Sequence, residues 1–537
     1  MIRAAQFTEA SPVRLAGPRL RAGRATHVWL TLVVGAATVA ATLLSEGNLV
    51  ATIAPVVLGA VLWAIWVAPL RVTLGVAMFL GLAVDRPGDA EGQWLSPFST
   101  LGGLMFHNLN HVIAIDQLKF SAVFALVCYL LVIRVHRLLT GRDRDTTGSL
   151  VPAAPMRWAM LAALVSVLGA AAWGLGQGGD GQMVKIQVQA YLQLLAVAYL
   201  FSVSLRERDY RWLAGVIVAA ACSKALVALW VRATVATYID QFGVLRELDY
   251  ATNHGDSLVF ACATAALIGP LFHRPTKRQI SWFLLLMPLI VAGVVANDRR
   301  IAWVQIALVV AAFLFMNPGS VFTRRVARVV ILSSPLLFVY GVVGWSSPSR
   351  IFAPVGFVRS IVQPERTDGS LDRSTLFRDI ENFNLVSTFR AHPVAGSGFG
   401  LPFSQVLAGD DLSGFKEYFF LPHNSMIGLW SFTGLFGFTG ILSPVLVGLF
   451  LSARAHKRAT SSLQAVASTA AIGCLFAYVV HLWGDIGFSE APTIFLVGLA
   501  MAVAGQLAMS TGAWPARWRE HHVEPSRSPR QDKHAWV

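Results

Sequence analysis

The sequence predicts an all-α polytopic membrane protein with about 12–14 transmembrane helices and one large loop on the outer side of the membrane. The composition, the length of the apolar runs and the placement of the basic residues all predict this class. Of the 537 residues, 55% are hydrophobic and 13% are charged. Soluble domains carry about 25% charged residues, so the composition excludes a soluble fold.

The apolar runs are long enough to cross a bilayer. A transmembrane helix needs roughly 17–25 predominantly apolar residues, and this length yields about fourteen candidate spans. Backbone polar groups inside lipid need internal partners, so we expect helices throughout. The candidate spans are 28–44, 49–69, 72–85, 118–134, 157–175, 186–204, 212–232, 256–272, 279–296, 300–316, 327–344, 424–452, 463–483 and 489–508.

Arginine and lysine gather in the N-terminal tail, in every second loop and in the C-terminal tail. Cytoplasmic segments carry an excess of these residues, so we expect both termini in the cytoplasm. The net charge of +14 then reflects topology and contact with anionic lipid, without any nucleic-acid partner. The predicted organisation is a cytoplasmic Arg-rich tail (1–27), transmembrane helices 1–11 (28–344), a large outer loop with an amphipathic helix (345–423), transmembrane helices 12–14 (424–508) and a cytoplasmic basic tail (509–537).

The four cysteines all fall inside apolar runs, at Cys128, Cys222, Cys262 and Cys474. Their spacing fits neither a metal site nor an extracellular disulfide framework. We therefore interpret them as small core side chains and expect no metal from them.

Arg299 and Arg300 lie between two candidate spans with almost no loop between them. So tight a hairpin holds both at the mouth of the helix bundle. Arginine suits phosphate because it has a permanent charge and a planar fork of donors. Anion binding is one interpretation, and snorkelling to lipid headgroups is the other. Arg246 is a second phosphate candidate, although Glu247 and Asp249 offer it simple ion pairs.

The outer loop contains a predicted amphipathic helix over 372–392. One side of it carries Leu376, Phe377, Ile380, Phe383, Val386 and Phe389, and the other carries Arg378, Asp379, Glu381, Asn382 and Asn384. Such a helix lies on the membrane or caps the bundle. It either covers a groove for a lipid-linked substrate or simply covers loop backbone.

His423 lies where the outer loop meets the next apolar helix. A neutral imidazole accepts a proton near physiological pH, so this residue is a candidate general base. Asn424 is the expected N-cap of the helix. The alternative is a capped loop histidine without chemistry. Upstream, Gly396 and Gly398 predict a tight turn rather than a nucleotide-binding loop, because no strand precedes them and no lysine follows.

Other polar residues carry weaker predictions. His254 and His392 also lie on the outer side, and interface anchoring is the preferred interpretation of His481. Lys224 lies within a candidate span, where a charge indicates function unless the side chain snorkels to the outer edge.

The stretch from Arg373 to about Gly440 resembles the signature region of the O-antigen ligase and O-antigen polymerase superfamily, the bacterial membrane glycan ligase-polymerase family. Here it consists of an arginine, an amphipathic helix, HPVAGSGFG, a variable loop, HNSMIGLW and the Gly-rich TGLFGFTG. NDRRIAW is similar to the family's short arginine motif, with Arg300 at the motif position and Arg299 extra. The close match covers a small part of the chain and does not separate ligases from polymerases.

This resemblance implies a glycosyltransferase C-like fold and a metal-independent transferase with no cofactor, in the bacterial inner membrane. The implied donor is a glycan on undecaprenyl pyrophosphate at the periplasmic face. The implied acceptor is lipid A-core, another glycan repeat or a protein. The implied general base is His423, which activates an acceptor hydroxyl. Pyrophosphate would be bound by Arg300, Arg299 and Arg246, with Asn424, Arg373, Gly396 and Gly398 in support.

Two other classes stay open from the sequence. A transporter or flippase of lipid-linked oligosaccharide would also need many helices and a basic cavity, but no convincing internal repeat is present. A scaffold subunit of an assembly complex would explain neither the arginine pair nor His423.

Overall fold

The computed structural model describes most of the chain in two compact units, residues 1–73 and 74–537. The described residues are 19–84, 96–109, 120–140, 151–235, 237–239, 245–248, 250–347, 349–352, 355–356, 358–359, 369–408, 416–484, 487 and 490–515. The start of the predicted N-terminal tail and most of the predicted C-terminal tail lie outside these residues.

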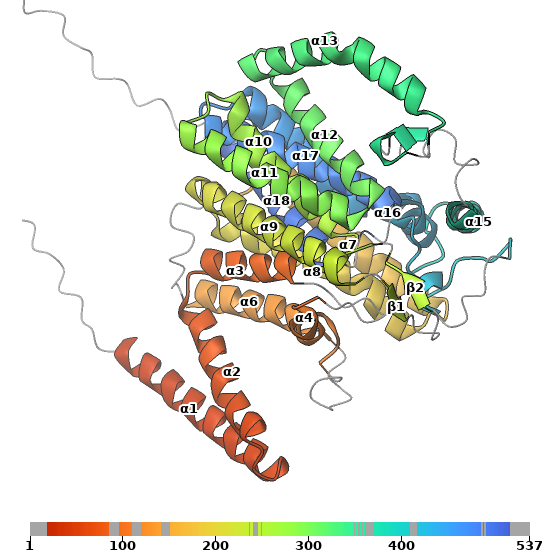
Figure 1. Ribbon diagram of the computed structural model, residues 1–537. Helices are drawn as coiled ribbons and strands as arrows, with labels where there is room; N and C mark the ends of the chain where they lie inside the picture. Colours follow the sequence, from red (N-terminus) through yellow and green to blue (C-terminus); the bar gives the residue numbers. More distant parts are fainter. Residues whose placement is uncertain are drawn as a thin grey trace, which may run out of the picture. The chain divides into compact units, whose positions relative to one another are not determined.

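The N-terminal unit is a hairpin of two helices, α1 (Arg19–Leu44) and α2 (Leu49–Val67) (Figure 1). The connection turns at Glu46 and Gly47, which both have positive φ. The first predicted span began at 28, but α1 begins at Arg19. The helix therefore includes part of the segment that the sequence assigned to a tail.

The described part of the large unit is almost entirely helical. Its helices are α3 (Leu70–Ala83, whose first four residues belong to the N-terminal unit), α4 (Ser99–Phe106), α6 (Ala122–Leu139), α7 (Ala154–Gly176), α8 (Gly181–Ser204), α9 (Tyr210–Thr234), α10 (Asp256–Ile268), α11 (Lys277–Asn297), α12 (Arg300–Met316), α13 (Val321–Gly344), α15 (Gly369–Ala391), α16 (Ser425–Lys457), α17 (Ser462–Gly484) and α18 (Ala491–Ser510). Short 3-10 turns include η1 (Glu207–Asp209), η2 (Gly269–Phe272), η3 (Arg350–Phe352) and η5 (Lys416–Phe419).

Within the described residues, nine helices are long and apolar enough to cross a membrane, and five shorter apolar helices accompany them. Each candidate span of the sequence coincides with one of these helices, which confirms an all-α fold of multi-pass membrane type. The exception to the all-α prediction is small. Between α9 and α10, β1 (Thr237–Ile239) and β2 (Leu245–Glu247) pair as an antiparallel ribbon.

Burial separates the helices into inner and outer ones. Almost every residue of α18 is buried, and it packs against α8, α16 and α17. By contrast, α13 buries only Gly344 and exposes apolar side chains all round. A helix that exposes apolar surface on every side needs an apolar solvent, so lipid is the natural environment of α13.

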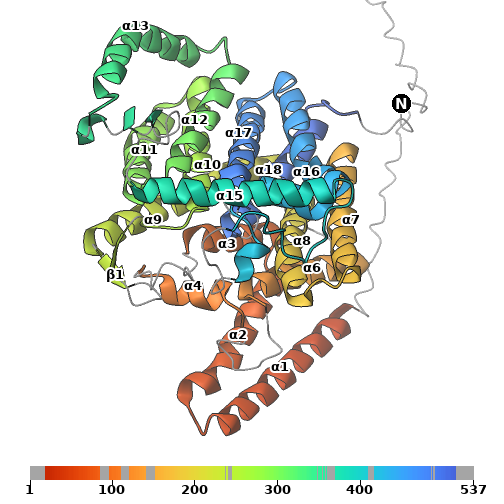
Figure 2. The same ribbon diagram turned by 90° about the vertical axis from the view of Figure 1, so that its right-hand side faces the viewer.

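Helix α15 lies across one end of the bundle (Figures 1 and 2). It packs against α16. The ends of α7, α9, α11 and α17 and the starts of α8, α10, α12, α16 and α18 meet at this end, because successive helices alternate in direction. We call it the α15 end.

Helix α16 is broken at Gly434, whose φ of 60° and ψ of −169° interrupt the helical backbone. The break leaves backbone groups without their usual helical partners. The glycine-rich loop 392–400 supplies partners, since Ser397 N donates to Ser431 O (3.0 Å) and Gly398 N donates to Phe432 O (2.8 Å). In return, Leu435 N donates to Pro393 O (3.0 Å). The motifs HPVAGSGFG and TGLFGFTG therefore form one unit, in which each motif supplies hydrogen-bond partners for backbone groups of the other.

Gly396 and Gly398 make the predicted tight turn, and both have positive φ. A Cβ at Gly396 would lie 2.3 Å from the backbone of Phe432, and one at Gly398 would lie 2.4 Å from Gly174 Cα of α7. Only glycine allows backbone to approach backbone this closely. The loop is thus locked between α7 and α16, which fixes the position of the chain that leads to His423.

Candidate functional site

His423 stands immediately before α16, between it and η5. Its ring nitrogen Nδ1 lies 3.3 Å from Glu381 Oε1, and its backbone N–H donates to the same oxygen at 3.2 Å. The ring stacks on Tyr418 (5.2 Å between centroids) and meets Phe377 edge-on (5.7 Å). The His423 side chain is 25% exposed and that of Glu381 only 4%. The imidazole is thus held in place, with Nδ1 facing a buried carboxylate and part of the side chain exposed.

This pairing selects the tautomer of His423. With Nδ1 protonated and donating to Glu381, the lone pair is on Nε2, which is the nitrogen able to accept a proton. The carboxylate also stabilises the imidazolium once that proton arrives. An imidazole held in this way can accept a proton at Nε2.

The prediction for the faces of α15 was wrong. Glu381 and Asn384 were assigned to a polar face opposite the apolar one, but both are buried, whereas Leu376 and Phe383 are 59% and 47% exposed. The reason is the loop beneath α15, whose backbone needs partners. Asn384 Oδ1 accepts from the N–H groups of Val406 and Leu407, at 2.9 Å and 2.8 Å. α15 thus covers loop backbone, one of its two predicted roles, and this docking brings Glu381 to His423.

Asn424 is the N-cap of α16, as predicted, and its Oδ1 accepts from Ile427 N at 3.1 Å. The next residue links the site to α18. Ser425 Oγ accepts from Gly487 N at 3.0 Å, three residues before Glu490. The start of α16 is therefore fixed on both sides.

The NDRR hairpin is as tight as the sequence predicts, because α11 ends at Asn297 and α12 begins at Arg300. Arg299 is buried, and its Nε donates to Thr252 O at 3.1 Å. Its guanidinium also covers the ring of Tyr250 at 4.1 Å. Asn297, which the sequence did not single out, accepts from Thr252 N through Oδ1 at 3.1 Å. Arg299 is thus part of the packing that holds the hairpin against the loop before α10.

Arg300 differs from its neighbour, since it is the first residue of α12 and is exposed. The other two predicted arginines have described backbones only. Arg246 lies in β2 opposite Tyr238, and Arg373 lies in α15. Their side chains lie outside the described residues.

Lys224 and Asp256 form a buried ion pair that the sequence interpretation missed. Lys224 Nζ lies 3.1 Å from Asp256 Oδ1, and the two side chains are 2% and 1% exposed. The snorkelling interpretation of Lys224 is therefore wrong. A lysine this deeply buried needs a charged partner nearby, and the first residue of α10 provides it.

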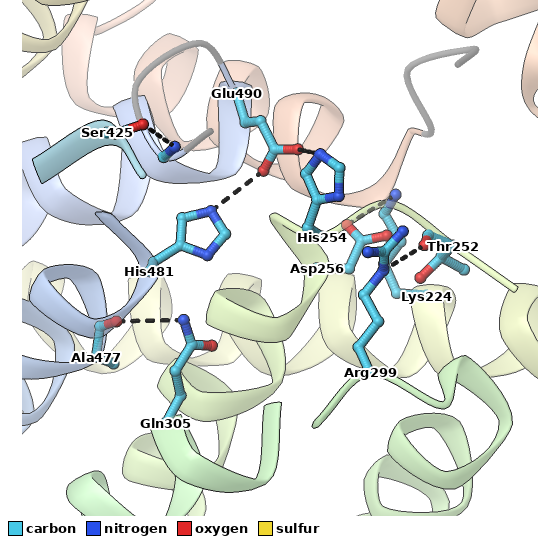
Figure 3. Close-up of polar contacts among 11 residues, drawn as sticks. Lys224, Thr252, His254, Asp256, Arg299, Gln305, Ser425, Ala477, His481 and Glu490 are labelled. Atoms are coloured by element: carbon cyan, nitrogen blue, oxygen red, sulfur yellow. Dashed lines mark hydrogen bonds and ion pairs between the residues drawn. The ribbon is translucent and has the colours of Figure 1, made fainter. Parts of the chain in front are cut away.

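Glu490 lies between two histidines from distant parts of the chain (Figure 3). Its Oε1 is 3.4 Å from His254 Nε2, and its Oε2 is 3.6 Å from His481 Nε2. His481 is fully buried, so its interpretation as an interface anchor is wrong. Figure 3 shows that the Lys224–Asp256 pair and Arg299 lie on the other side of His254. We call Lys224, His254, Asp256, His481 and Glu490 the polar floor.

A cavity of about 520 Å³ adjoins the polar floor. Its lining includes Lys224, Asp256 and Glu490, together with Glu417 and Leu421 of the segment before His423. Within the described residues, His423 and Arg300 are not part of this lining. The cavity and the His423–Glu381 pair are thus neighbours along the chain segment 417–423.

Among the described residues, no group of three or more histidine, cysteine, aspartate or glutamate side chains is arranged to hold a metal ion. No protein-family model matches the chain, and the search of curated proteins finds no significant match.

Proposed function

We propose that this protein is a membrane glycosyltransferase that moves a glycan from undecaprenyl pyrophosphate to an acceptor hydroxyl at the periplasmic face of the bacterial inner membrane. The observation that carries the proposal is the His423–Glu381 pair beneath α15. The resemblance of 373–440 to O-antigen ligases and polymerases supports the choice of substrates.

In the proposed reaction, His423 Nε2 takes the proton of the acceptor hydroxyl as its oxygen attacks the anomeric carbon of the donor sugar. The bond between that carbon and the pyrophosphate oxygen breaks, and the pyrophosphate leaves with the electron pair. Glu381 holds the imidazole in the required tautomer and stabilises its charge. A sugar hydroxyl is a poor nucleophile unless deprotonated, so this base has a defined task.

The leaving pyrophosphate concentrates negative charge, which fixed cations stabilise. Arg300 is the first candidate, because its side chain is exposed and it opens α12, where the helix N-terminus adds partial positive charge. Arg299 has a supporting part, since its Nε already donates to Thr252 O. Arg300→Lys should therefore severely reduce transfer, whereas Arg299→Lys should mainly lower stability.

The test of the proposal is His423→Ala in cells, with His392→Ala as the control because His392 is an exposed histidine of the same loop. The His423 variant should lose about 10²–10⁴-fold of transfer, the range for a general base. Its lipid-linked donor should accumulate on the outer face of the membrane. Normal glycan transfer by His423→Ala at wild-type protein level would end the proposal.

A flippase for the same lipid-linked sugar is the second candidate. The broken α16 and the buried Lys224–Asp256 pair favour it, since discontinuous helices and intramembrane charges are common in transporters. The site of accumulation separates the two functions. A flippase defect would leave the lipid-linked donor on the cytoplasmic face.

Glycan analysis of a deletion strain would then separate ligase from polymerase. Unpolymerised single repeats would indicate a polymerase, and long unattached chains would indicate a ligase.

A further inference from the structure

We propose that the 520 Å³ cavity beside the polar floor binds a sugar unit of the substrate, and that its charge makes it select uncharged sugars over acidic ones. This inference rests on the proposed function and deepens it, because it names the part of the substrate that enters the cavity and the property by which it is chosen.

The cavity is in the right place for such a role. Its lining comes from the segments that meet at the α15 end, including the N-terminal half of α8 and the first turns of α10 and α18. Glu417 and Leu421 close one side, and Leu421 is two residues before His423. A sugar held here lies beside the segment that carries the proposed base. The volume falls within the range of ordinary ligand pockets, about 300–1,000 Å³.

The lining has the chemistry that a polyhydroxyl ligand requires. Four amides of the described lining, Asn108, Gln189, Gln193 and Asn253, each present both donors and acceptors. Phe106 adds an aromatic surface, against which the C–H face of a sugar ring can pack. An apolar chain such as a polyprenyl tail would displace water from these amides without offering them hydrogen bonds, and this desolvation disfavours it.

The charge of the lining supplies the selectivity. Among the described lining residues, Asp256, Glu417 and Glu490 contribute three carboxylates and Lys224 contributes one ammonium group. Lys224 is held at 3.1 Å by Asp256, so its charge is largely compensated. The described lining thus carries a net negative formal charge, which would repel a carboxylate on the sugar but not an uncharged sugar.

The same charge argues against pyrophosphate in this cavity. A group with several negative charges would be repelled by Glu417 and Glu490 more strongly than a single uronate. The phosphate end of the donor therefore belongs elsewhere, and the exposed Arg300 at the start of α12 is the proposed place. The substrate is thus divided into a sugar end and a phosphate end, which are recognised by groups of opposite charge.

The experiment measures the binding of two disaccharides to the full-length protein in lipid nanodiscs, by saturation-transfer NMR. N,N′-diacetylchitobiose is the neutral probe, and a hyaluronan disaccharide with one uronate is the acidic probe. We expect the neutral probe to bind about three- to ten-fold more tightly, the effect of one screened charge repulsion. Equal affinities, tighter binding of the uronate, or no binding of the neutral probe would overturn the inference.

Two variants connect binding to this cavity. Gln193→Leu removes an amide and should weaken the neutral probe at least about three-fold. Glu417→Gln removes an exposed carboxylate and should strengthen the uronate probe about three-fold without changing the neutral one. Asp379→Asn is the matched control, since Asp379 is an exposed carboxylate of α15 outside the cavity lining. Unchanged binding in both Gln193→Leu and Glu417→Gln would place the probes elsewhere and sink the inference.

The inference and the proposed function fail in different ways. Binding of a free disaccharide needs no transfer, so His423→Ala should keep wild-type affinity for the neutral probe. If His423→Ala blocks transfer but chitobiose does not bind, the result supports the transferase and refutes the sugar site. If chitobiose binds as expected but His423→Ala still transfers glycan, the sugar site stands and the assignment of the base falls.

Discussion

His423 and His481 each face a glutamate, but their surroundings differ. His423 is 25% exposed and lies between α15 and α16. His481, a residue of α17, is fully buried and faces Glu490. A base must exchange its proton with a substrate, so of these two histidines only the partly exposed His423 fits the proposed role. The difference teaches that a carboxylate partner alone does not identify a base and that exposure is needed as well. His254 is also partly exposed, but its partner Glu490 is shared with His481.

The cations divide in the same way. Arg300 is exposed at the start of a helix, whereas Lys224 is buried and paired with Asp256. A ligand can reach the first, and the second is committed to the fold. The polar floor is thus held by internal ion pairs, and the segment from η5 to α16 carries the residue to which the proposed function assigns the proton transfer.

The largest expected effect comes from the buried ion pair. Lys224→Met leaves Asp256 as a buried charge without its ammonium partner and should lower the free energy of unfolding by about 3–5 kcal/mol. The double variant Lys224→Met, Asp256→Leu removes both charges and should recover most of that loss. Thermal unfolding of the purified protein measures both.

If the double variant is no more stable than Lys224→Met alone, the Lys224–Asp256 pair does not stabilise the fold in the way that the comparison predicts. Arg300→Lys is the matched control, because it changes an exposed cation and should leave the unfolding temperature unchanged.

The next effect concerns activity. Glu381→Gln keeps the shape of the side chain but loses the charge that orients and stabilises the His423 imidazole. We expect transfer to fall by roughly 10²-fold, with the loss in turnover rather than in donor affinity. The measurement is the rate of transfer as a function of donor concentration. Asp379→Asn, at an exposed carboxylate of the same helix, is the control; an equal loss in both variants would refute a specific role for Glu381.

The sequence predicted the parts of the site that depend on neighbouring residues. Each transmembrane helix is a continuous apolar run, so its place is readable from about twenty residues at a time. Asn424 as N-cap and the glycine turn at 396–398 follow from local backbone chemistry in the same way.

The parts that the sequence missed depend on contacts between distant segments. Glu381 meets His423, and Glu490 meets His254, but no periodicity connects these positions. The faces of α15 were assigned from apolar spacing, yet the loop beneath demanded hydrogen bonds, and this demand decided which face is buried. The sequence did mark Lys224 as unusual, because a charge inside a transmembrane span is costly. Its partner Asp256 could not be predicted, because the contact depends on where the short helix α10 packs.

A smaller effect tests the support of the His423 segment. Gly398→Ala adds a Cβ that would lie 2.4 Å from Gly174 Cα, at a φ of +95°. We expect about 2 kcal/mol of destabilisation from overpacking, in addition to about 1 kcal/mol from the backbone conformation. Gly178→Ala is the matched control, with a φ of +90° and nothing within 4 Å, and should show only the conformational part. The measurement compares the unfolding temperatures of the two variants. Equal decreases would contradict the close packing of the glycine-rich loop against α7.

The smallest effect lies at the end of the bundle away from α15. Burial, with a smaller contribution from the neighbouring His456, lowers the pKa of His273 below its ordinary value. The folded protein therefore prefers a neutral His273, while the unfolded chain takes up a proton below about pH 6.5. The stabilisation is present above that pH and is lost as the pH falls through the lower folded pKa. The unfolding temperature should thus decrease on acidification, and His273→Asn should make it decrease less. His392→Ala, at an exposed histidine of the α15 end, should leave the pH dependence unchanged. An identical pH dependence in wild type and His273→Asn would show that the acid sensitivity lies elsewhere, with the histidines of the polar floor as the next groups to test.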